Sequence, residues 1–228
     1  MKKNLFLPLL LIFIFAACTP TDAISPTVEL PIYKIGYSPN LEPYREGFRS
    51  CANQITTGLF SFQRFHILND ENVDLYIHLG EPEEMPNFTA QIGLEKLVVI
   101  THPNNETSPT KTDLQNIFTG RLNNWVKVGG EGEIAVWVLP AENEASQIFQ
   151  EYYLDSMLFK GSSQVAPGPA QILEVVGSDP LSIAYLPQSW STSTISALDI
   201  GIEVPILVLA DSEPEGELRE FVACLQKP

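Results

Sequence analysis

Three polar turns contain the residues whose chemistry could serve a ligand. They lie at 37–40, 79–81 and 140–146, and each follows an apolar, strand-like segment. Ligands of parallel α/β sheets collect at the carboxyl ends of strands, close to helix N-termini, where backbone N–H groups and short polar side chains are free to bind. The sequence therefore predicts a binding site built from these turns. The residues expected to contribute are Ser38, Asn40, Gly80, Asn143 and Ser146.

The sequence lacks the patterns that are typical of catalytic, nucleotide-binding and metal sites. No GxSxG, Walker A or GxGxxG motif occurs, and no spacing places Ser, His and Asp as a catalytic triad. The three histidines, at positions 66, 78 and 102, have no metal-ligand spacing. We therefore expect no enzymatic activity, no cofactor and no metal site. The chain has 28 acidic and 13 basic residues, a net charge of −15, which disfavours nucleic acid as a partner because nucleic acid requires clustered Lys and Arg.

Apolar periodicity predicts the elements that position the three turns. Strands are expected immediately before the turns, and helical spacing follows the first and third turns, with Asn40 and Asn143 as caps. Because strands alternate with helices along the chain, we expect an α/β fold with parallel sheets. The predicted strands are 32–37, part of 60–68, 73–79, 97–100, 134–139, 181–186 and 204–209, and the predicted helices are 41–55, 111–119, 144–157, 170–176 and 214–225.

The N-terminal segment has the composition of a lipoprotein signal peptide. Two lysines precede an apolar stretch, residues 5–15, and Cys18 follows two alanines. That stretch is too short for a hydrocarbon core of about 30 Å, which needs roughly 20 residues. The pattern resembles the bacterial lipobox, except that Phe15 stands where Leu is usual, which leaves cleavage by ordinary signal peptidase as an alternative. We expect a signal peptide over 1–17, a lipid on Cys18, and a proline-rich tether over 18–31 that anchors an extracytoplasmic protein to the bacterial cell membrane.

Two further cysteines belong to the mature chain. Cys51 lies on the apolar stripe of the first predicted helix, and Cys224 lies in the last. An oxidising exterior favours a disulfide between them, whereas in the alternative they are two simple buried thiols. Both alternatives stay open at the level of the sequence.

Three segments resemble a known family. Residues 112–125 read TDLQNIFTGRLNNW, residues 97–104 are an apolar strand ending in Pro-Asn, and residues 178–187 read SDPLSIAYLP. Phosphate-type periplasmic substrate-binding proteins of ABC transporters carry similar pieces in the same order: a crossing strand ending in NP, a short helix ending IF-x-G and then NW, and a strand of the type aIGYlp. The chain resembles that family over about Ile92–Pro187.

The resemblance implies a two-lobed, periplasmic-binding-protein-like (Venus flytrap) α/β fold in which each lobe is a sheet flanked by helices. Lobe 1 would hold residues 32–99 and 187–228, and lobe 2 residues 100–186. Strands that cross between the lobes near Thr101 and Tyr185 would form the hinge, so both residues become candidates for ligand contact. A small molecule or anion would bind between the lobes, and a membrane permease of an ABC transporter would recognise the closed form.

The third turn departs from the family pattern. Phosphate binders of that family place Arg and then Ser-Gly-Thr there, whereas this chain has Glu142, Asn143 and Glu144. A carboxylate about 4–6 Å from a bound dianion would cost on the order of 1–4 kcal/mol per charge pair, so phosphate is disfavoured. In the alternative interpretation Asn143 and Glu144 only cap the helix, and the cleft takes a neutral, cationic or weakly anionic ligand, or none.

The expected function is lipid-anchored solute binding for an ABC-type transporter. The alternative is a degenerate binding-protein domain that acts as a surface sensor or protein-interaction module without a transport role.

Overall fold

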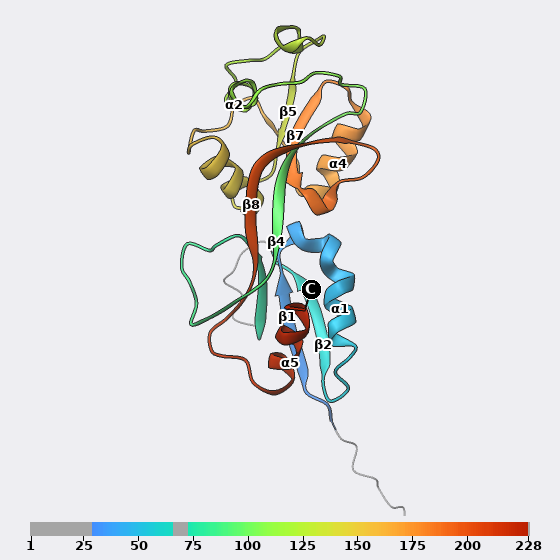
Figure 1. Cartoon of the computed structure of the whole chain (residues 1–228), viewed down its shortest axis with the longest axis vertical. Helices are drawn as coiled ribbons and strands as arrows, with labels where there is room; N and C mark the ends of the chain where they lie inside the picture. Colours follow the sequence, from blue (N-terminus) through green and yellow to red (C-terminus); the bar gives the residue numbers. More distant parts are fainter. Residues whose placement is uncertain (1–28, 66–72, 228) are drawn as a thin grey trace, which may run out of the picture.

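The computed structural model describes residues 29–65 and 73–227 of an elongated molecule with a lower and an upper lobe (Figure 1). The expected signal peptide over 1–17, the lipid on Cys18 and the tether as far as residue 28 lie outside the described residues. In the two described ranges, no helix combines the length and the apolar character needed to cross a membrane.

One eight-stranded sheet runs through both lobes, in the strand order β2-β1-β3-β8-β4-β7-β5-β6. Figure 1 shows β1 and β2 in the lower lobe, with α1 and α5 beside them, and β5 and β7 in the upper lobe. The strands are β1 (Ile32–Tyr37), β2 (Leu59–Arg64), β3 (Leu75–Leu79), β4 (Phe88–Thr101), β5 (Ala135–Val138), β6 (Gln164–Val165), β7 (Ser182–Pro187) and β8 (Ser196–Ala210).

The sheet is mixed, so the prediction of parallel sheets is wrong for part of it. β1 is parallel to β2 and β3, and β5 is parallel to β6 and β7. β8 is antiparallel to β3 and β4, and β4 is antiparallel to β7. Within residues 29–65 and 73–227, each antiparallel ladder between named strands involves β4 or β8. Their directions depend on pairing between segments about 100 residues apart, and local periodicity does not encode such pairing.

Two long antiparallel strands connect the lobes. β4 and β8 pair from Phe88 with Ala210 to Thr101 with Ser196, and Figure 1 shows both running from one lobe into the other. β7 pairs with β5 on one side and, on the other, with β4 over residues 97–101 alone, and it therefore belongs to the upper lobe. The second crossing strand is thus β8, not the segment around Tyr185 from which a hinge was expected.

Helices follow the strands where the sequence predicts them, but two of them differ from the predicted α-helix in type. The first predicted helix begins as the 3-10 helix η1, because Pro43 lies inside it, and the third ends early in a π-helical turn, η3. The capping box of Thr110 and Asp113 is present. The helices are η1 (Pro39–Tyr44), α1 (Arg45–Ala52), α2 (Lys111–Phe118), η2 (Trp125–Val128), α3 (Glu144–Ile148), η3 (Phe149–Tyr153), α4 (Pro169–Ser178), η4 (Gln188–Trp190) and α5 (Gly216–Leu225).

The helices of the lower lobe are joined covalently. Cys51 on α1 and Cys224 on α5 form a disulfide, with their Cα atoms 5.7 Å apart. The bond links parts of the chain that are 173 residues apart and attaches the C-terminal helix to the N-terminal one. It therefore fixes both helices against the same lobe.

Candidate binding site between the two lobes

Glu144, at the start of α3 in the upper lobe, meets polar side chains of the lower lobe. Its Oε2 accepts hydrogen bonds from the hydroxyl of Ser38 and from Nδ2 of Asn40, the latter at 3.2 Å. Its Oε1 lies 3.2 Å from Nε2 of His78. Glu144 is only 8% exposed, so this contact is a buried polar cluster that crosses from one lobe to the other.

The lower-lobe members of the cluster are held by the ends of two neighbouring strands. Ser38 directly follows β1, and its backbone N–H donates to Ile77 of β3 at 2.9 Å. The Ser38 hydroxyl also accepts the backbone N–H of Asn40 at 3.2 Å, which caps η1. His78 lies on β3 itself. Because β1 and β3 are parallel neighbours, their carboxyl ends bring these three side chains together.

The Glu144 side of the cluster is positioned by the turn before α3. Asn143 is the N-cap residue, and its side chain accepts the backbone N–H of Ala145 at 3.0 Å. The predicted capping role of Asn143 is therefore present in the structure. Glu144 turns away from its own helix toward the lower lobe, so it does more than cap.

Hydrogen-bond geometry limits where hydrogens can lie in the contact between His78 and Glu144. Nδ1 of His78 lies 3.0 Å from the carbonyl oxygen of Gly80, and a carbonyl can only accept, so Nδ1 carries hydrogen. The contact between Nε2 and Oε1 then requires a second hydrogen, held either by the imidazole or by the carboxyl. In both arrangements the pair is neutral overall, which makes its burial less costly than that of a lone carboxylate.

Burial raises the pKa of the Glu144 carboxyl above its ordinary value. His78, the Ser38 and Asn40 side chains and the backbone N–H of Leu79 lower the same pKa, but desolvation outweighs them. Tyr76, on the same strand as His78, is another titratable group near the carboxyl, and burial also raises the pKa of its phenol.

Gly80 allows the lobes to approach closely. Its φ is +80°, a left-handed conformation that side chains with a Cβ rarely adopt. A Cβ at this position would lie 2.8 Å from Cδ1 of Ile148 on α3. The predicted site residue Gly80 thus lies at the contact between the lobes, where its backbone carbonyl also accepts from His78.

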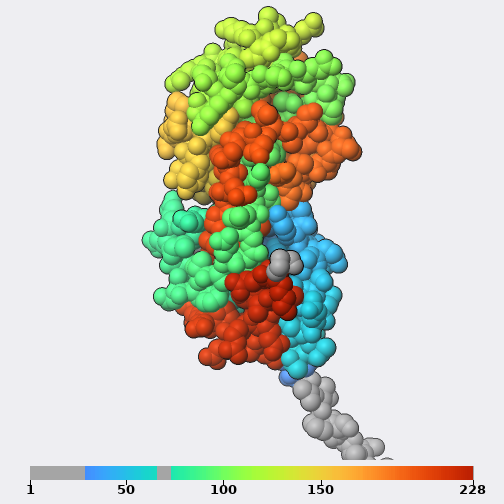
Figure 2. Space-filling view, viewed as in Figure 1, coloured from blue at the N-terminus to red at the C-terminus, as the bar shows by residue number. Residues whose placement is uncertain are grey.

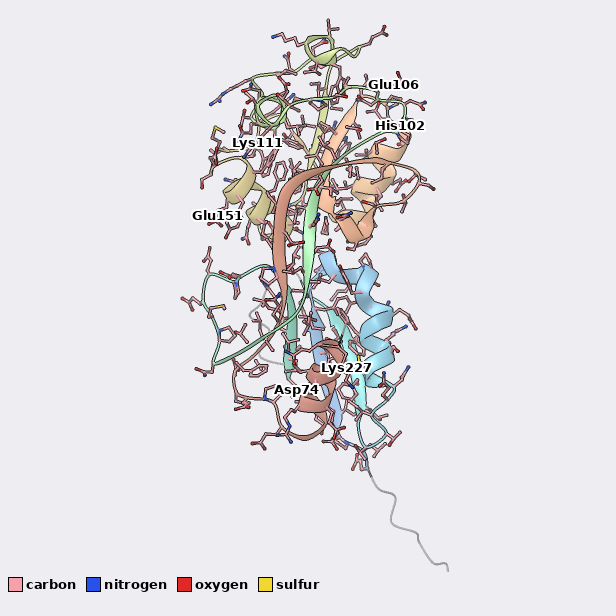
Figure 3. All side chains as sticks on the ribbon, in the orientation of Figure 1. Asp74, His102, Glu106, Lys111, Glu151 and Lys227 are labelled. Atoms are coloured by element: carbon pink, nitrogen blue, oxygen red, sulfur yellow. A yellow bond between two sulfur atoms is a disulfide. The ribbon has the colours of Figure 1, made fainter. Side chains whose placement is uncertain are left out.

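A pocket of about 1030 Å³ opens beside this cluster. Its walls come from the loop after β3, from α3 and η3, and from the part of β8 near Glu203 where the two lobes meet. Figure 2 shows the waist between the lobes, and Figure 3 labels Glu151 at the lower edge of the upper lobe. Seven lining side chains are glutamates: Glu81, Glu83, Glu84, Glu142, Glu144, Glu151 and Glu203.

Two predicted site residues serve the interior of the upper lobe. The hydroxyl of Tyr185 donates to Ser146 at 2.9 Å and accepts the backbone N–H of Leu139 at 3.2 Å. The Ser146 hydroxyl donates to the Leu139 carbonyl at 3.3 Å. Tyr185 is 0% exposed, and its ring stacks on Phe149 with a centroid separation of 4.2 Å. Neither residue lines the pocket.

Thr101 lies away from the cluster. It is the last residue of β4 and pairs with Ile183 of β7, inside the upper lobe. Figure 3 labels the next residue, His102, far from the waist. Among the predicted residues, the structure therefore brings Ser38, Asn40 and Gly80 to the contact between the lobes, while Thr101 and Tyr185 lie elsewhere.

A second polar contact joins the lobes near η4. Nε1 of Trp190 donates to the backbone carbonyl of Asn40 at 2.7 Å. Glu95 on β4 is buried, and it accepts from the hydroxyl of Tyr44 at 2.9 Å and from the backbone N–H of Ser189 at 3.3 Å. Asn40 thus contacts the upper lobe through its side chain and through its backbone.

Sequence reasoning did not select Glu144, His78 or Glu95 as residues of the site. A histidine at the end of an otherwise apolar strand is a signal for His78, because such a position adjoins the strand's carboxyl end. Nothing local distinguishes Glu95, which lies in a half-polar stretch. In residues 29–65 and 73–227, no group of three or more His, Cys, Asp or Glu side chains is arranged to hold a metal ion.

Comparisons with known proteins agree on the type of fold. A family model described as "PBP superfamily domain" matches residues 81–214. No curated protein sequence matches the chain significantly.

Several solved structures have a similar fold and align with most of this chain. A substrate-binding protein assigned to phosphate ABC transport, with bound phosphate, from Clostridium perfringens aligns with a TM-score of 0.77 and 17% identity over 85% of this chain and 92% of that chain. An ABC-type phosphate transport receptor from Vibrio cholerae gives 0.67 and 16%, over 86% and 93%. The reduced OxyR regulatory domain from Pseudomonas aeruginosa gives 0.60 and 14%, over 86% and 98%. At these identities the likeness shows the fold, and the predicted two-lobed α/β fold is confirmed.

Proposed function

The chain belongs to the PBP superfamily, and on this premise we propose that it is an extracytoplasmic solute-binding protein of an ABC-type transporter. A lipid on Cys18 would anchor it to the membrane, and a small ligand would bind between the lobes, whose proposed boundaries near residues 100 and 187 leave β8 shared between them. A membrane permease would be its partner. The family is one of binding proteins rather than of enzymes, in agreement with the prediction of a non-enzymatic role.

The observation that carries the proposal is the pocket of about 1030 Å³ at the junction of the lobes. Small-molecule sites are concave, and they occur preferentially between domains. This one adjoins the crossing strand β8, so a ligand that contacts both walls would favour one relative position of the lobes. Phosphate ABC transport proteins of the same fold supply the transport part of the proposal.

The charge of the lining favours a cationic or neutral ligand. Seven glutamates line the pocket, and among the described lining residues His78 alone has a side chain that can carry a positive charge. Clefts lined by one sign of charge concentrate ions of the opposite sign. A free oxyanion would instead be repelled by the glutamate walls.

A ligand screen by thermal shift tests the proposal. A ligand at a hundredfold its Kd stabilises a protein by about 2.7 kcal/mol, which corresponds to a rise in Tm of roughly 5–11 °C for a chain of this size. Amines and basic amino acids, neutral sugars, and phosphate, sulfate and molybdate form the three arms of the screen. If no arm raises the Tm, the transport receptor loses its support.

Matched variants show whether a hit uses the pocket. Glu203→Gln and Glu151→Gln each remove one charge from the lining and should weaken binding of a cationic hit. Glu46→Gln removes the same charge from the exposed face of α1, outside the pocket, and should leave binding unchanged.

The second candidate function, a surface sensor or interaction module, is favoured by the Glu144 contact. This contact joins side chains of the two lobes directly. The reduced OxyR domain, a regulatory domain, shows that the fold also serves regulation. A protein of this second kind would give no hit in the small-molecule screen.

A further inference from the structure

Glu144 covers a set of buried hydrogen-bond donors at the floor of the pocket. Ser38 and Asn40 are 0% and 1% exposed, and neither lines the pocket. Glu144 does line it, and its carboxylate lies between the pocket and these two side chains. The hydroxyl and the amide therefore lie behind the carboxylate, away from the pocket.

These donors have the chemistry of an oxyanion site. When the hydrogen of the His78–Glu144 contact lies on the imidazole, a hydroxyl, a carboxamide N–H and an imidazole N–H converge on the two oxygens of the Glu144 carboxylate, which can then only accept. The donors come from the ends of β1 and β3, and the acceptor comes from the other lobe. This is the arrangement by which a protein holds a free carboxylate or a similar anion, except that the anion here is part of the chain.

We propose that Glu144 is an internal ligand: its carboxylate occupies an oxyanion site made by Ser38, Asn40 and His78, and thereby determines that the cleft rejects free oxyanions. An incoming anion would have to displace the carboxylate from its donors and then remain beside it in the same pocket. Both steps are unfavourable, because buried donors left unpaired and like charges brought together each cost free energy.

One polar atom of the site makes no hydrogen bond with the Glu144 carboxylate. In the described part of the chain, Oδ1 of Asn40 is buried and has no hydrogen-bond partner. Nδ2 of the same amide donates to Glu144 and to the Ser38 hydroxyl. The site thus retains an acceptor that Glu144 does not use.

The inference rests on the proposed function only in placing ligands between the lobes. It identifies Glu144 as the residue that prevents the cleft from binding free oxyanions. Whether the wild-type protein binds some other solute is a separate question, and the experiment below answers the two independently.

The test is chemical rescue of Glu144→Ala by acetate. This substitution removes the side-chain atoms that correspond to an acetate ion, so acetate should enter the space and restore the hydrogen bonds. We expect the Tm of Glu144→Ala to rise with acetate concentration and to saturate, relative to chloride at equal ionic strength. Propionate, which is longer by one methylene, should be weaker because it would contact the new alanine. The wild-type protein should show no acetate-dependent rise.

Three control variants separate this effect from general effects of charge. Glu142→Ala removes an exposed carboxylate from the same pocket wall and should not respond to acetate. Glu144→Gln keeps the space filled and should not respond either. Adding Ser38→Ala to Glu144→Ala removes a donor and should abolish most of the response.

The outcomes divide cleanly. A wild-type protein that binds acetate as well as Glu144→Ala does, or a Glu144→Ala protein that shows no acetate response, overturns the inference. If Glu144→Ala fails to fold in chloride buffer, refolding in acetate replaces the Tm measurement, and an equal yield in both salts counts against the site. Rescue of Glu144→Ala together with an empty wild-type solute screen would support the internal ligand and reject the solute receptor.

Discussion

The contact between Ser38 and Glu144 predicts a measurable coupling between the two lobes. Removing the Ser38 hydroxyl eliminates a hydrogen bond to a buried carboxyl group, worth about 1.5–3 kcal/mol, and a cap on η1, worth about 1 kcal/mol. Ser38→Ala should therefore destabilise the protein by about 2–4 kcal/mol. Glu144→Ala should cost about 3–5 kcal/mol, since it leaves buried partners unpaired.

The double variant isolates the contact itself. Once Glu144 is alanine, the Ser38 hydroxyl has lost this acceptor, so its removal should cost less than in the wild type. The expected coupling energy is about 1.5–3 kcal/mol. Urea unfolding of the four proteins provides the free energies, with fluorescence and circular dichroism recorded together to check that the transitions coincide.

A matched cycle provides the control. Tyr33, near the start of the same strand, donates its hydroxyl to Glu217 at 2.9 Å and lies roughly 16 Å along β1 from Ser38. Tyr33→Phe combined with Glu144→Ala should be additive within about 0.5 kcal/mol. If the Ser38 cycle is equally additive, the contact between the lobes contributes no coupling, and the reasoning is refuted.

Three further predictions follow from the same structure. Gly80→Ala should destabilise the protein by about 1–3 kcal/mol, because φ is +80° and the new Cβ would press on Ile148; a urea midpoint equal to that of the wild type would contradict this. Cys51→Ser combined with Cys224→Ser should cost about 2–5 kcal/mol, and dithiothreitol should destabilise the wild type but not the double variant. Because the pKa of the Glu144 carboxyl is raised from its ordinary value of 4.5, its contribution to stability is present below that pH and is lost as the pH rises through the folded-state pKa. The free energy of unfolding of the wild type minus that of Glu144→Gln should therefore be larger at acidic than at alkaline pH, and a difference independent of pH would exclude the raised pKa.

The sequence predicts the turns of the lower lobe because local rules determine them. Ser38 and Asn40 lie where a strand meets a helix cap, and Gly80 follows a strand of continuous apolar character. Apolar periodicity and helix capping depend on residues close together in the sequence, so both can be deduced without knowledge of the rest of the fold.

Strand direction and side-chain partners are harder to predict from the sequence. The pairing of β4 with β8 joins residues about 100 positions apart, and the half-polar stretch before Leu97 gives little sign of a strand. Tyr185 is a related case, because a tyrosine on a predicted crossing strand could face either the cleft or the core. The stack with Phe149 inside the upper lobe depends on how α3 packs, which no local pattern states.

The role of Glu144 illustrates the same limit. As a residue in the first turn of a helix, it suggests capping, and as a negative charge it argues against phosphate. Its contacts with Ser38 and His78 arise only when the lobes come together. The first expectation confined the carboxylate to its own helix and the second made it a neighbour of the ligand, whereas the structure places it among the donors that a ligand would use.

Calorimetric titration of the wild-type protein with inorganic phosphate tests the central claim most directly. If Glu144 occupies the donors between the lobes and glutamates line the pocket, millimolar phosphate should produce no heat of binding beyond dilution. A micromolar dissociation constant would contradict the account, because phosphate would then bind in spite of the internal carboxylate.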